Sequence, residues 1–338
     1  MKPEDHILFA CARQDFTDEH KQAVLEISRK YSLSWDVIFS KAEQHGVAPL
    51  VYINLCQGEG LGLCIPESIV NRYRLFAMRN SVRKEQRVQR TLQALEYFNA
   101  QSIDVMLIKG GALDLLVYDH AMLITSNDID LVLKRRREEL SPDQIQQIMN
   151  DLHQSGIEYD FYSHHDMTIN GALPVDFGRI WRDATQIDYR GQPAWMMSPE
   201  DMLISVCINS CRKRYFRLKS LLDIAETLRK MDAIRWDGVV EKSRQYDCQN
   251  IVYTALLVCQ QTLGCRLPPG ALPRLGVNPL RAVVINSIAK FLLRFSSLPV
   301  APISGISLLG KQMHFSLVLP YASYRFYQIR HKLFDEIL

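Results

Sequence analysis

The chain has 338 residues, of which 47% are hydrophobic and 23% charged, a composition that fits a globular protein and excludes a disordered or collagen-like chain. Its formal charge of +3 is too small to indicate a nucleic-acid partner from total charge alone. No apolar run approaches the roughly 20 residues that a membrane helix needs, and the N-terminus lacks the pattern of a signal peptide. We therefore expect a cytoplasmic protein with no membrane partner.

The first 98 residues are predicted to form helices. Amphipathic stretches cover residues 23–28 and 35–44, and the second of them ends at Gly46. Residues 72–99 follow as one long segment that is rich in Arg, Gln, Leu and Glu and has few helix breakers. We expect this segment to lead directly into a β-sheet, so that residues 1–98 form an N-terminal helical region.

Residues 104–108 are predicted to be a buried strand that runs through Lys109, Gly110 and Gly111 into a helix. Glycines at such a turn let backbone N–H groups approach a phosphate, and the helix N-terminus adds partial positive charge. Lys109 would place an ammonium group beside the same phosphate. A Lys-Gly-Gly turn alone is weak evidence for a phosphate-binding site, so the prediction depends on the motifs that follow.

An Asp-x-Asp motif, Asp128 and Asp130, lies in the run 126–133, which begins at Ser126 and is predicted to be a strand. Residues two apart on a strand share a face, so both carboxylates point the same way while Ile129 points into the core. Paired carboxylates repel each other unless a cation lies between them, and hard oxygen ligands suit Mg²⁺. The alternative is a solvated surface strand, which is the usual role of a lone Asp-x-Asp.

A third carboxylate follows two further predicted elements, a helix over residues 142–152 and a strand over 157–162. Residues 173–177 are predicted to be a short strand with Asp176 facing away from its apolar neighbours. Asp176 could bind a metal or accept the proton of an attacking hydroxyl. The order strand, helix, strand, helix, strand, strand predicts a small mixed sheet with helices on one side. The ordered set is stronger evidence for a phosphoryl- or nucleotidyl-transfer site than any single member.

Helices are predicted again from Ser198, which caps a helix that begins with Pro199. Further helices are expected over residues 216–231, 236–246, 250–263 and 281–295. The tail mixes aromatic and basic residues, which could stack on nucleobases, although packing on the helical domain is the favoured interpretation. The predicted regions are therefore 1–98, 99–192 for the core, 193–298 for a C-terminal helical domain and 299–338 for the tail.

Two basic clusters lie close to these motifs in the sequence, at residues 134–137 and 212–219. Either cluster could hold a triphosphate or an RNA backbone through charge pairing. For the first cluster, a solvated surface is the favoured interpretation. For the second, the two interpretations are evenly balanced, because it follows a helix that should pack close to the site.

Three motifs taken together carry a resemblance to a known family: residues 109–113 with Tyr118, residues 128–132, and residues 175–176. The combination is similar to the uncharacterised branch of the nucleotidyltransferase superfamily that includes DNA polymerase beta. Residues 35–52 and 198–224 are similar to that family's N-terminal and C-terminal helical parts. The resemblance implies an α+β fold, in which a small mixed β-sheet nucleotidyltransferase core is flanked by N-terminal and C-terminal helical regions. The catalytic and metal-binding residues that it implies are Asp128, Asp130 and Asp176, and the nucleotide-binding residues are Lys109, Gly110, Gly111 and Ser126.

The chain departs from the family's pattern around this site. The second turn residue is Gly111, where Ser is common in relatives, and Ile124 and Thr125 stand where relatives often carry an Arg. Gly178 and Asn209 stand where relatives often carry a His. The metal site thus matches the family while the residues that would contact substrate are altered, which weakens a prediction of turnover more than a prediction of fold.

The function expected from these features is metal-dependent nucleotidyl transfer. An NMP would move from an NTP, with ATP the expected nucleotide, to an acceptor hydroxyl, with release of pyrophosphate and with Mg²⁺ or Mn²⁺ as cofactor. The acceptor stays open between RNA, a protein and a small molecule. The alternative is a catalytically weak or inactive member of the fold that acts as a nucleotide sensor or a partner-binding module.

Overall fold

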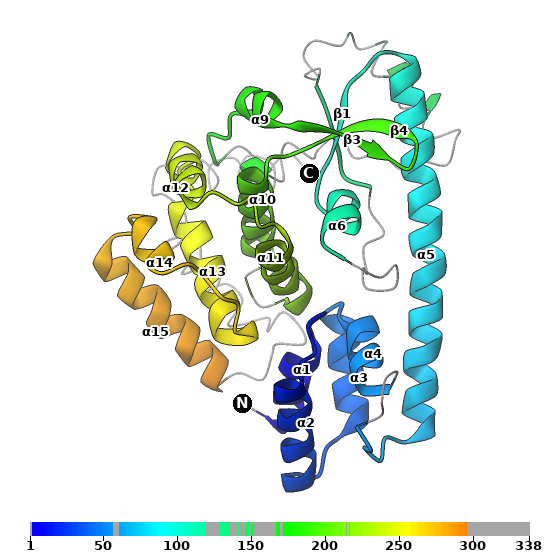
Figure 1. Cartoon of the computed structure of the whole chain (residues 1–338), viewed down its shortest axis with the longest axis vertical. Helices are drawn as coiled ribbons and strands as arrows, with labels where there is room; N and C mark the ends of the chain where they lie inside the picture. The colour runs from blue at the N-terminus through cyan, green and yellow to red at the C-terminus, as the bar shows by residue number, and fades with distance from the viewer. Residues whose placement is uncertain are drawn as a thin grey trace, which may run out of the picture.

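The computed structural model describes residues 2–56, 61–118, 129–134, 141, 143, 146–148, 150–151, 167–169, 172–213, 215 and 217–295. Within these ranges the chain is mostly helical and contains one four-stranded mixed sheet. The α+β class predicted from the sequence is confirmed. Figure 1 shows the sheet at the top, the N-terminal helices within residues 3–56 at the bottom and the helices that follow the sheet in the sequence at the left.

Four short helices open the chain: α1 (Pro3–Cys11), α2 (Asp18–Lys30), α3 (Trp35–Gln44) and α4 (Ala48–Cys56). The helix expected at residues 35–44 has these bounds in the structure, and the stretch 23–28 is the middle of the longer α2. Their apolar faces form a shared core that includes Ile7, Ile38 and Val51. A fully buried ion pair between Asp5 and Lys41 joins α1 to α3.

The long helix α5 (Glu67–Ala100) connects the N-terminal helices to the sheet (Figure 1). Its 34 residues span ~50 Å at the usual helical rise. Near its start, the ring of Tyr73 packs against Phe39 of α3 and Tyr52 of α4. At its end, Asn99 Nδ2 donates a hydrogen bond to the carbonyl oxygen of Pro193 on the sheet (3.1 Å). The predicted helix at 72–99 is confirmed.

The sheet has the strand order β2-β1-β4-β3. The strands are β1 (Val105–Leu107), β2 (Leu131–Leu133), β3 (Thr185–Tyr189) and β4 (Gln192–Met196). The inner strand β1 runs antiparallel to β2 and parallel to β4, and all its side chains are buried. The strand predicted over 126–133 is confirmed for 131–133, while residues 126–128 lie outside the described residues.

Two sequence-based expectations about the sheet are corrected. Residues 173–177 do not form a strand: Pro174 has no backbone N–H, and Asp176 instead caps helix α9 (Phe177–Asp183). The hairpin of β3 and β4, which supplies half of the sheet, was not predicted. Its two-residue turn, Arg190 and Gly191, has positive φ at both positions, as this kind of hairpin requires. The strand expected at 157–162 lies outside the described residues.

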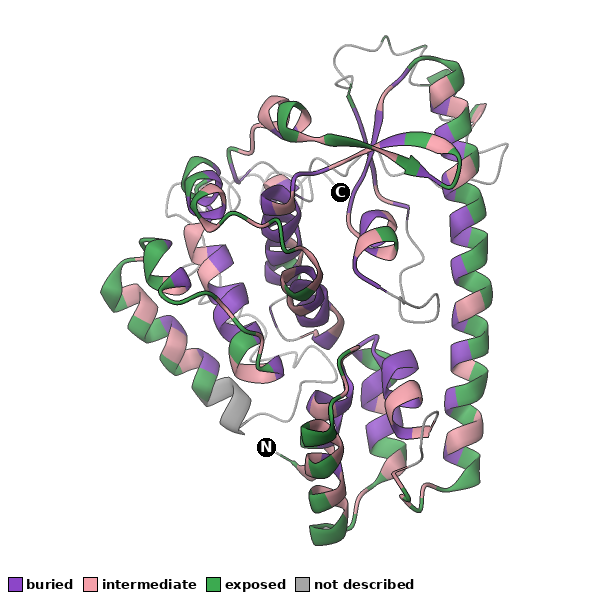
Figure 2. Cartoon of the chain, in the orientation of Figure 1, coloured by how far each residue is buried: buried purple, intermediate pink, exposed green. Residues whose placement is uncertain are grey.

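The C-terminal helices are α10 (Pro199–Arg212), α11 (Leu218–Lys230), α12 (Trp236–Gln245), α13 (Gln249–Leu263), α14 (Ala271–Arg274) and α15 (Pro279–Phe295). The predicted cap is confirmed, because Ser198 Oγ accepts the N–H of Asp201 (3.2 Å). Helix α10 is buried on almost every side by its neighbours (Figure 2). The tail at 299–338 lies outside the described residues, and the predicted region boundaries stay predictions.

None of the helices in the described ranges combines the length and the apolar character that a bilayer crossing requires. Helix α6 (Gly110–Leu116) is the element that follows β1, and it lies between the sheet and the N-terminal helices (Figure 1). It is the helix predicted to follow the Lys-Gly-Gly turn.

Candidate active site

One edge of the sheet gathers the ends of all four strands. Leu107, the last residue of β1, pairs with Leu131, the first residue of β2. Met196, at the end of β4, pairs with both Leu107 and Thr185, the first residue of β3. The turn after β1, the segment before β2 and the end of α9 therefore lie at this edge, which we call the site edge.

Lys109 and Asp130 form an ion pair at the site edge, with 2.8 Å between Lys109 Nζ and Asp130 Oδ1. Their side chains are only 15% and 13% exposed, so the two charges are screened little by solvent. The backbone continues the sheet here, because the N–H of Ile108 donates to the carbonyl oxygen of Asp130 (3.2 Å). Ile129 is buried, as the sequence predicts, while the carboxylate of Asp130 faces the lysine.

The turn from β1 into α6 has an unusual backbone. Lys109 adopts φ 47° and ψ −120°, a conformation that costs a non-glycine residue roughly 1–3 kcal/mol and that is often found at functional sites. Helix α6 begins at the next residue, so the N–H groups of Gly110, Gly111 and Ala112 have no partner within the helix. A carboxylate, an ammonium group and the start of a helix are thus brought together within one turn of chain.

Asp176 takes a different position from the one expected. Its Oδ1 accepts the N–H of Arg179 (3.1 Å), and its Oδ2 lies 3.7 Å from the guanidinium of Arg182. No contact between Asp176 and Asp130 is recorded among the described residues, and the same part of the chain has no group of three His, Cys, Asp or Glu side chains placed to hold a metal ion. Asp128 and Ser126 lie outside the described residues, so the carboxylate triad stays a prediction.

A family model described as "Uncharacterised nucleotidyltransferase" matches residues 31–264, which is more than half of the chain. The chain belongs to this nucleotidyltransferase family. No curated protein and no solved structure matches the chain. The matched range contains the Lys109 turn, the Asp-x-Asp motif and Asp176. The predicted family resemblance is confirmed, and membership in a nucleotidyltransferase family supports a transferase.

The positions that are predicted to depart from the family pattern can be placed in part. At Gly111, an added Cβ would meet only the side chain of Leu107, at an ordinary contact distance of 3.8 Å. At Gly178, an added Cβ would approach Oδ1 of Asp176 to 3.1 Å and disturb the cap of α9. Packing therefore tolerates a side chain at Gly111 but resists one at Gly178. Ile124 and Thr125 lie outside the described residues.

The structure adds to the site edge an ion pair that sequence patterns did not reveal. Asp183 is the last residue of α9, and its Oδ2 lies 2.8 Å from Lys242 Nζ on α12. Lys242 is buried, donates a hydrogen bond to Ser198 Oγ (3.0 Å) and pairs with Asp201. The hydrogen bond from Lys242 lowers the pKa of Asp183. Asp183 and Lys242 belong to no shared motif, so only the fold could bring them together.

Tyr118, a member of the family motif, anchors the far end of α6. Its hydroxyl donates to Asp223 of α11, and burial followed by the charge of Asp223 raises the pKa of Tyr118 well above its usual range. Lys219, from the second basic cluster, lies 2.5 Å from Asp223 Oδ1 and is held in this contact. Lys134, from the first cluster, pairs with Asp104 (2.7 Å). Both lysines therefore have carboxylate partners within the protein.

Proposed function

We propose that this family member is a metal-dependent nucleotidyltransferase that moves an NMP from an NTP to an acceptor hydroxyl and releases pyrophosphate. The observation that carries the proposal is the partly buried Lys109–Asp130 pair, which lies directly beside the N-terminus of α6. Helix N-termini and lysines bind phosphate, and carboxylates bind the cation that accompanies it. ATP is the nucleotide we expect.

Asp130 and Asp128 would hold Mg²⁺ or Mn²⁺. The donor chemistry of Asp130 fits, because Mg²⁺ takes one or two carboxylates together with oxygen atoms of substrate phosphates. When bound, the metal would neutralise charge that develops on the phosphate oxygens. Lys109 and the N–H groups at Gly110 and Gly111 would bind the triphosphate and orient its α-phosphorus toward the acceptor.

Asp176 would accept the proton of the acceptor hydroxyl. Its side chain is 44% exposed, so an acceptor can reach it while its Oδ1 caps α9. In the proposed step the acceptor oxygen forms a bond to the α-phosphorus, the bond from that phosphorus to the bridging oxygen breaks, and pyrophosphate leaves with the bonding electrons. The acceptor class stays open between RNA, a protein and a small molecule.

The test compares Asp130→Asn with a matched control, Asp104→Asn. Each substitution removes a carboxylate from one ion pair that flanks β1 and β2, but the pair of Asp104 with Lys134 lies at the opposite end of β1. We expect Asp130→Asn to lower pyrophosphate release from ATP with Mg²⁺ by ~100-fold or more, and Asp104→Asn to leave it within ~3-fold. Release is measured with each NTP, with and without cellular RNA. Full activity in Asp130→Asn would overturn the assignment.

The second candidate is a nucleotide sensor or partner-binding module. It is favoured by Asp176, which is already engaged in capping α9, and by the altered position Gly111. Calorimetric titration with ATP, with and without Mg²⁺, separates the candidates. Binding without pyrophosphate release would indicate a sensor, whereas absence of binding would indicate that only the helical surfaces of the fold are used.

A further inference from the structure

The middle of α5 is amphipathic in the reverse of the usual sense. Its inward face carries the buried polar residues Asn80, Lys84 and Arg87. Its outward face carries Leu75 at 54%, Met78 at 59% and Val82 at 59% exposure. A surface helix normally buries its apolar side and exposes its polar side, so the outward face needs an explanation.

The inward polar residues are accounted for within the chain. Asp114 of α6 forms an ion pair with Arg87, and its Oδ1 lies 3.3 Å from Lys84 Nζ. All three side chains are less than one-tenth exposed, as expected when buried charges find partners. The contact with α6 thus explains the inward face of α5, but it leaves the outward apolar residues unexplained.

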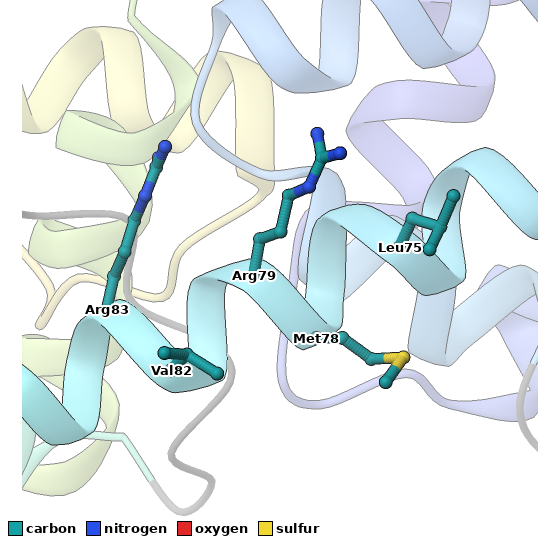
Figure 3. Close-up of a pocket in the computed structure, with 5 residues that line it drawn as sticks. All are labelled: Leu75, Met78, Arg79, Val82 and Arg83. Carbon is teal, nitrogen blue, oxygen red and sulfur yellow. The ribbon is translucent and has the colours of Figure 1, made fainter.

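The outward residues form one continuous surface. Leu75, Met78 and Val82 are spaced by three and then four positions, which places them on one side of the helix. Together with Arg79 and Arg83 they line a shallow depression of about 390 Å³ (Figure 3), and we call these five residues the α5 stripe. A cluster of exposed apolar side chains rimmed by charge marks an interaction site more often than plain surface.

The charge along the α5 stripe is mostly positive, and the nearest acidic residue on the helix is the exposed Glu85, three positions after Val82. Residues 68–84 contain no acidic residue, and this segment also exposes Arg72 and Arg74. No ion pair of Arg79 or Arg83 is recorded with any described residue, whereas Arg72 pairs with Asp36. The α5 stripe therefore combines apolar side chains with two arginines that are available to an acidic partner.

We propose that the α5 stripe binds an acidic amphipathic helix of a partner protein. The spacing of Leu75, Met78 and Val82 matches the apolar seam of a facing helix, and glutamates or aspartates beside that seam would pair with Arg79 and Arg83. A nucleic acid would pair with the arginines but leave the apolar side chains without a contact. A second copy of this chain would bring arginines of like charge into one seam, which is unfavourable.

Fluorescence anisotropy with the full chain tests the proposal. The probes are two labelled synthetic helices, each with leucines at the seam positions, one with glutamates and the other with lysines beside the seam. We expect the glutamate probe to bind at least ~10-fold more tightly, with a difference that shrinks at high salt. Arg79→Glu combined with Arg83→Glu should reverse the preference, and Met78→Asp should weaken binding of both probes.

Leu280→Asp on α15 is the matched control, because Leu280 is a 79% exposed leucine outside the α5 stripe, and it should leave binding of the probes unchanged. Circular dichroism and thermal unfolding check that every variant is folded. We expect the fold to be retained because the substituted residues are exposed. Equal binding of both probes, or no effect of the arginine reversals, would overturn the proposal. The proposal would also be overturned if the chain formed a dimer that Met78→Asp dissociates. The same holds if an RNA oligonucleotide bound through Arg79 and Arg83 while neither helix bound.

Discussion

Gly111 and Gly178 are two positions where the sequence predicts a departure from the family pattern, but their surroundings differ. The space beside Gly111 is bordered by the aliphatic side chain of Leu107, whereas Gly178 lies against the carboxylate of Asp176. Neither glycine has the positive φ that would require a glycine for backbone reasons. A side chain added at Gly111 would therefore alter the proposed substrate contact, whereas one added at Gly178 would alter packing.

Gly111→Ser should restore a hydroxyl at the N-terminus of α6 without loss of stability. We expect its KM for ATP to fall by roughly 2–10-fold, the value of one additional hydrogen bond, with thermal unfolding close to that of the native chain. The comparison variant, Gly178→Ser, should unfold at a lower temperature because its Cβ crowds the cap at Asp176. If Gly111→Ser binds ATP no better, the turn does not contact phosphate in the way we propose.

At the scale of single elements, α6 is a short helix that is held along its whole length. Lys109 pairs with Asp130 before its first residue, Asp114 pairs with α5 in its middle, and Tyr118 donates to α11 just beyond its end. A seven-residue helix has little stability of its own. The position of the proposed phosphate-binding turn therefore depends on contacts from three other elements.

Asp114→Asn should destabilise the protein strongly. The substitution deprives two buried cations, Lys84 and Arg87, of this carboxylate, and breaking a buried pair in this way costs ~3–5 kcal/mol. Asp104→Asn, which breaks an ion pair whose side chains are about half exposed, should cost less than ~1 kcal/mol. Urea denaturation measures both free energies of unfolding. Similar costs for the two variants would contradict the view that α5 holds α6 through a desolvated pair.

Periodicity and capping residues were sufficient to predict most helices, because α3, α10 and α12 carry clear amphipathic patterns or start signals. The hairpin was missed although β3 carries a short alternation, with Thr185, Ile187 and Tyr189 separated by the polar Gln186 and Asp188 and with Gly191 as a turn signal. Only Tyr189 of this five-residue edge strand is buried, so the apolar signal is weak. Lys109 and Asp130 were both identified from motifs, but their contact with each other was not predicted. The contacts Asp183–Lys242 and Asp114–Arg87 could not be predicted, since they join elements whose packing no local pattern specifies.

At the scale of the whole molecule, His45 links the N-terminal helices to the C-terminal bundle. Its Nδ1 lies 3.4 Å from the backbone N–H of Leu218, which donates to it, and its carbonyl oxygen accepts the N–H of Lys219 (3.1 Å). Burial, and then the charges of Lys41 and Arg217, lower the pKa of His45 to about 4. The imidazole is therefore neutral near pH 7 and can accept the hydrogen bond at the start of α11.

This link should weaken in acid. The unfolded chain protonates His45 near pH 6.5 while the folded chain resists until about pH 4, so the unfolded state binds more protons in between. The contribution of His45 is complete above pH 6.5 and is lost as the pH falls toward 4, by up to ~3 kcal/mol. Denaturation curves of the native chain and of His45→Asn at several pH values measure the difference. Parallel pH profiles would exclude this role for His45.

The parallel pairing of β1 with β4 has a consequence for how the protein is made. Leu107 pairs with Met196, which is synthesised roughly 90 residues later. Translation of these residues takes about 5–20 s at the usual rates. During that interval the apolar inner strand has no neighbour on its β4 side, and Asp183 has no Lys242, which is synthesised later still. A nascent or truncated chain can thus contain Lys109, Asp130 and Asp176 and still lack the assembled sheet edge, so the proposed activity would begin only when synthesis is well advanced.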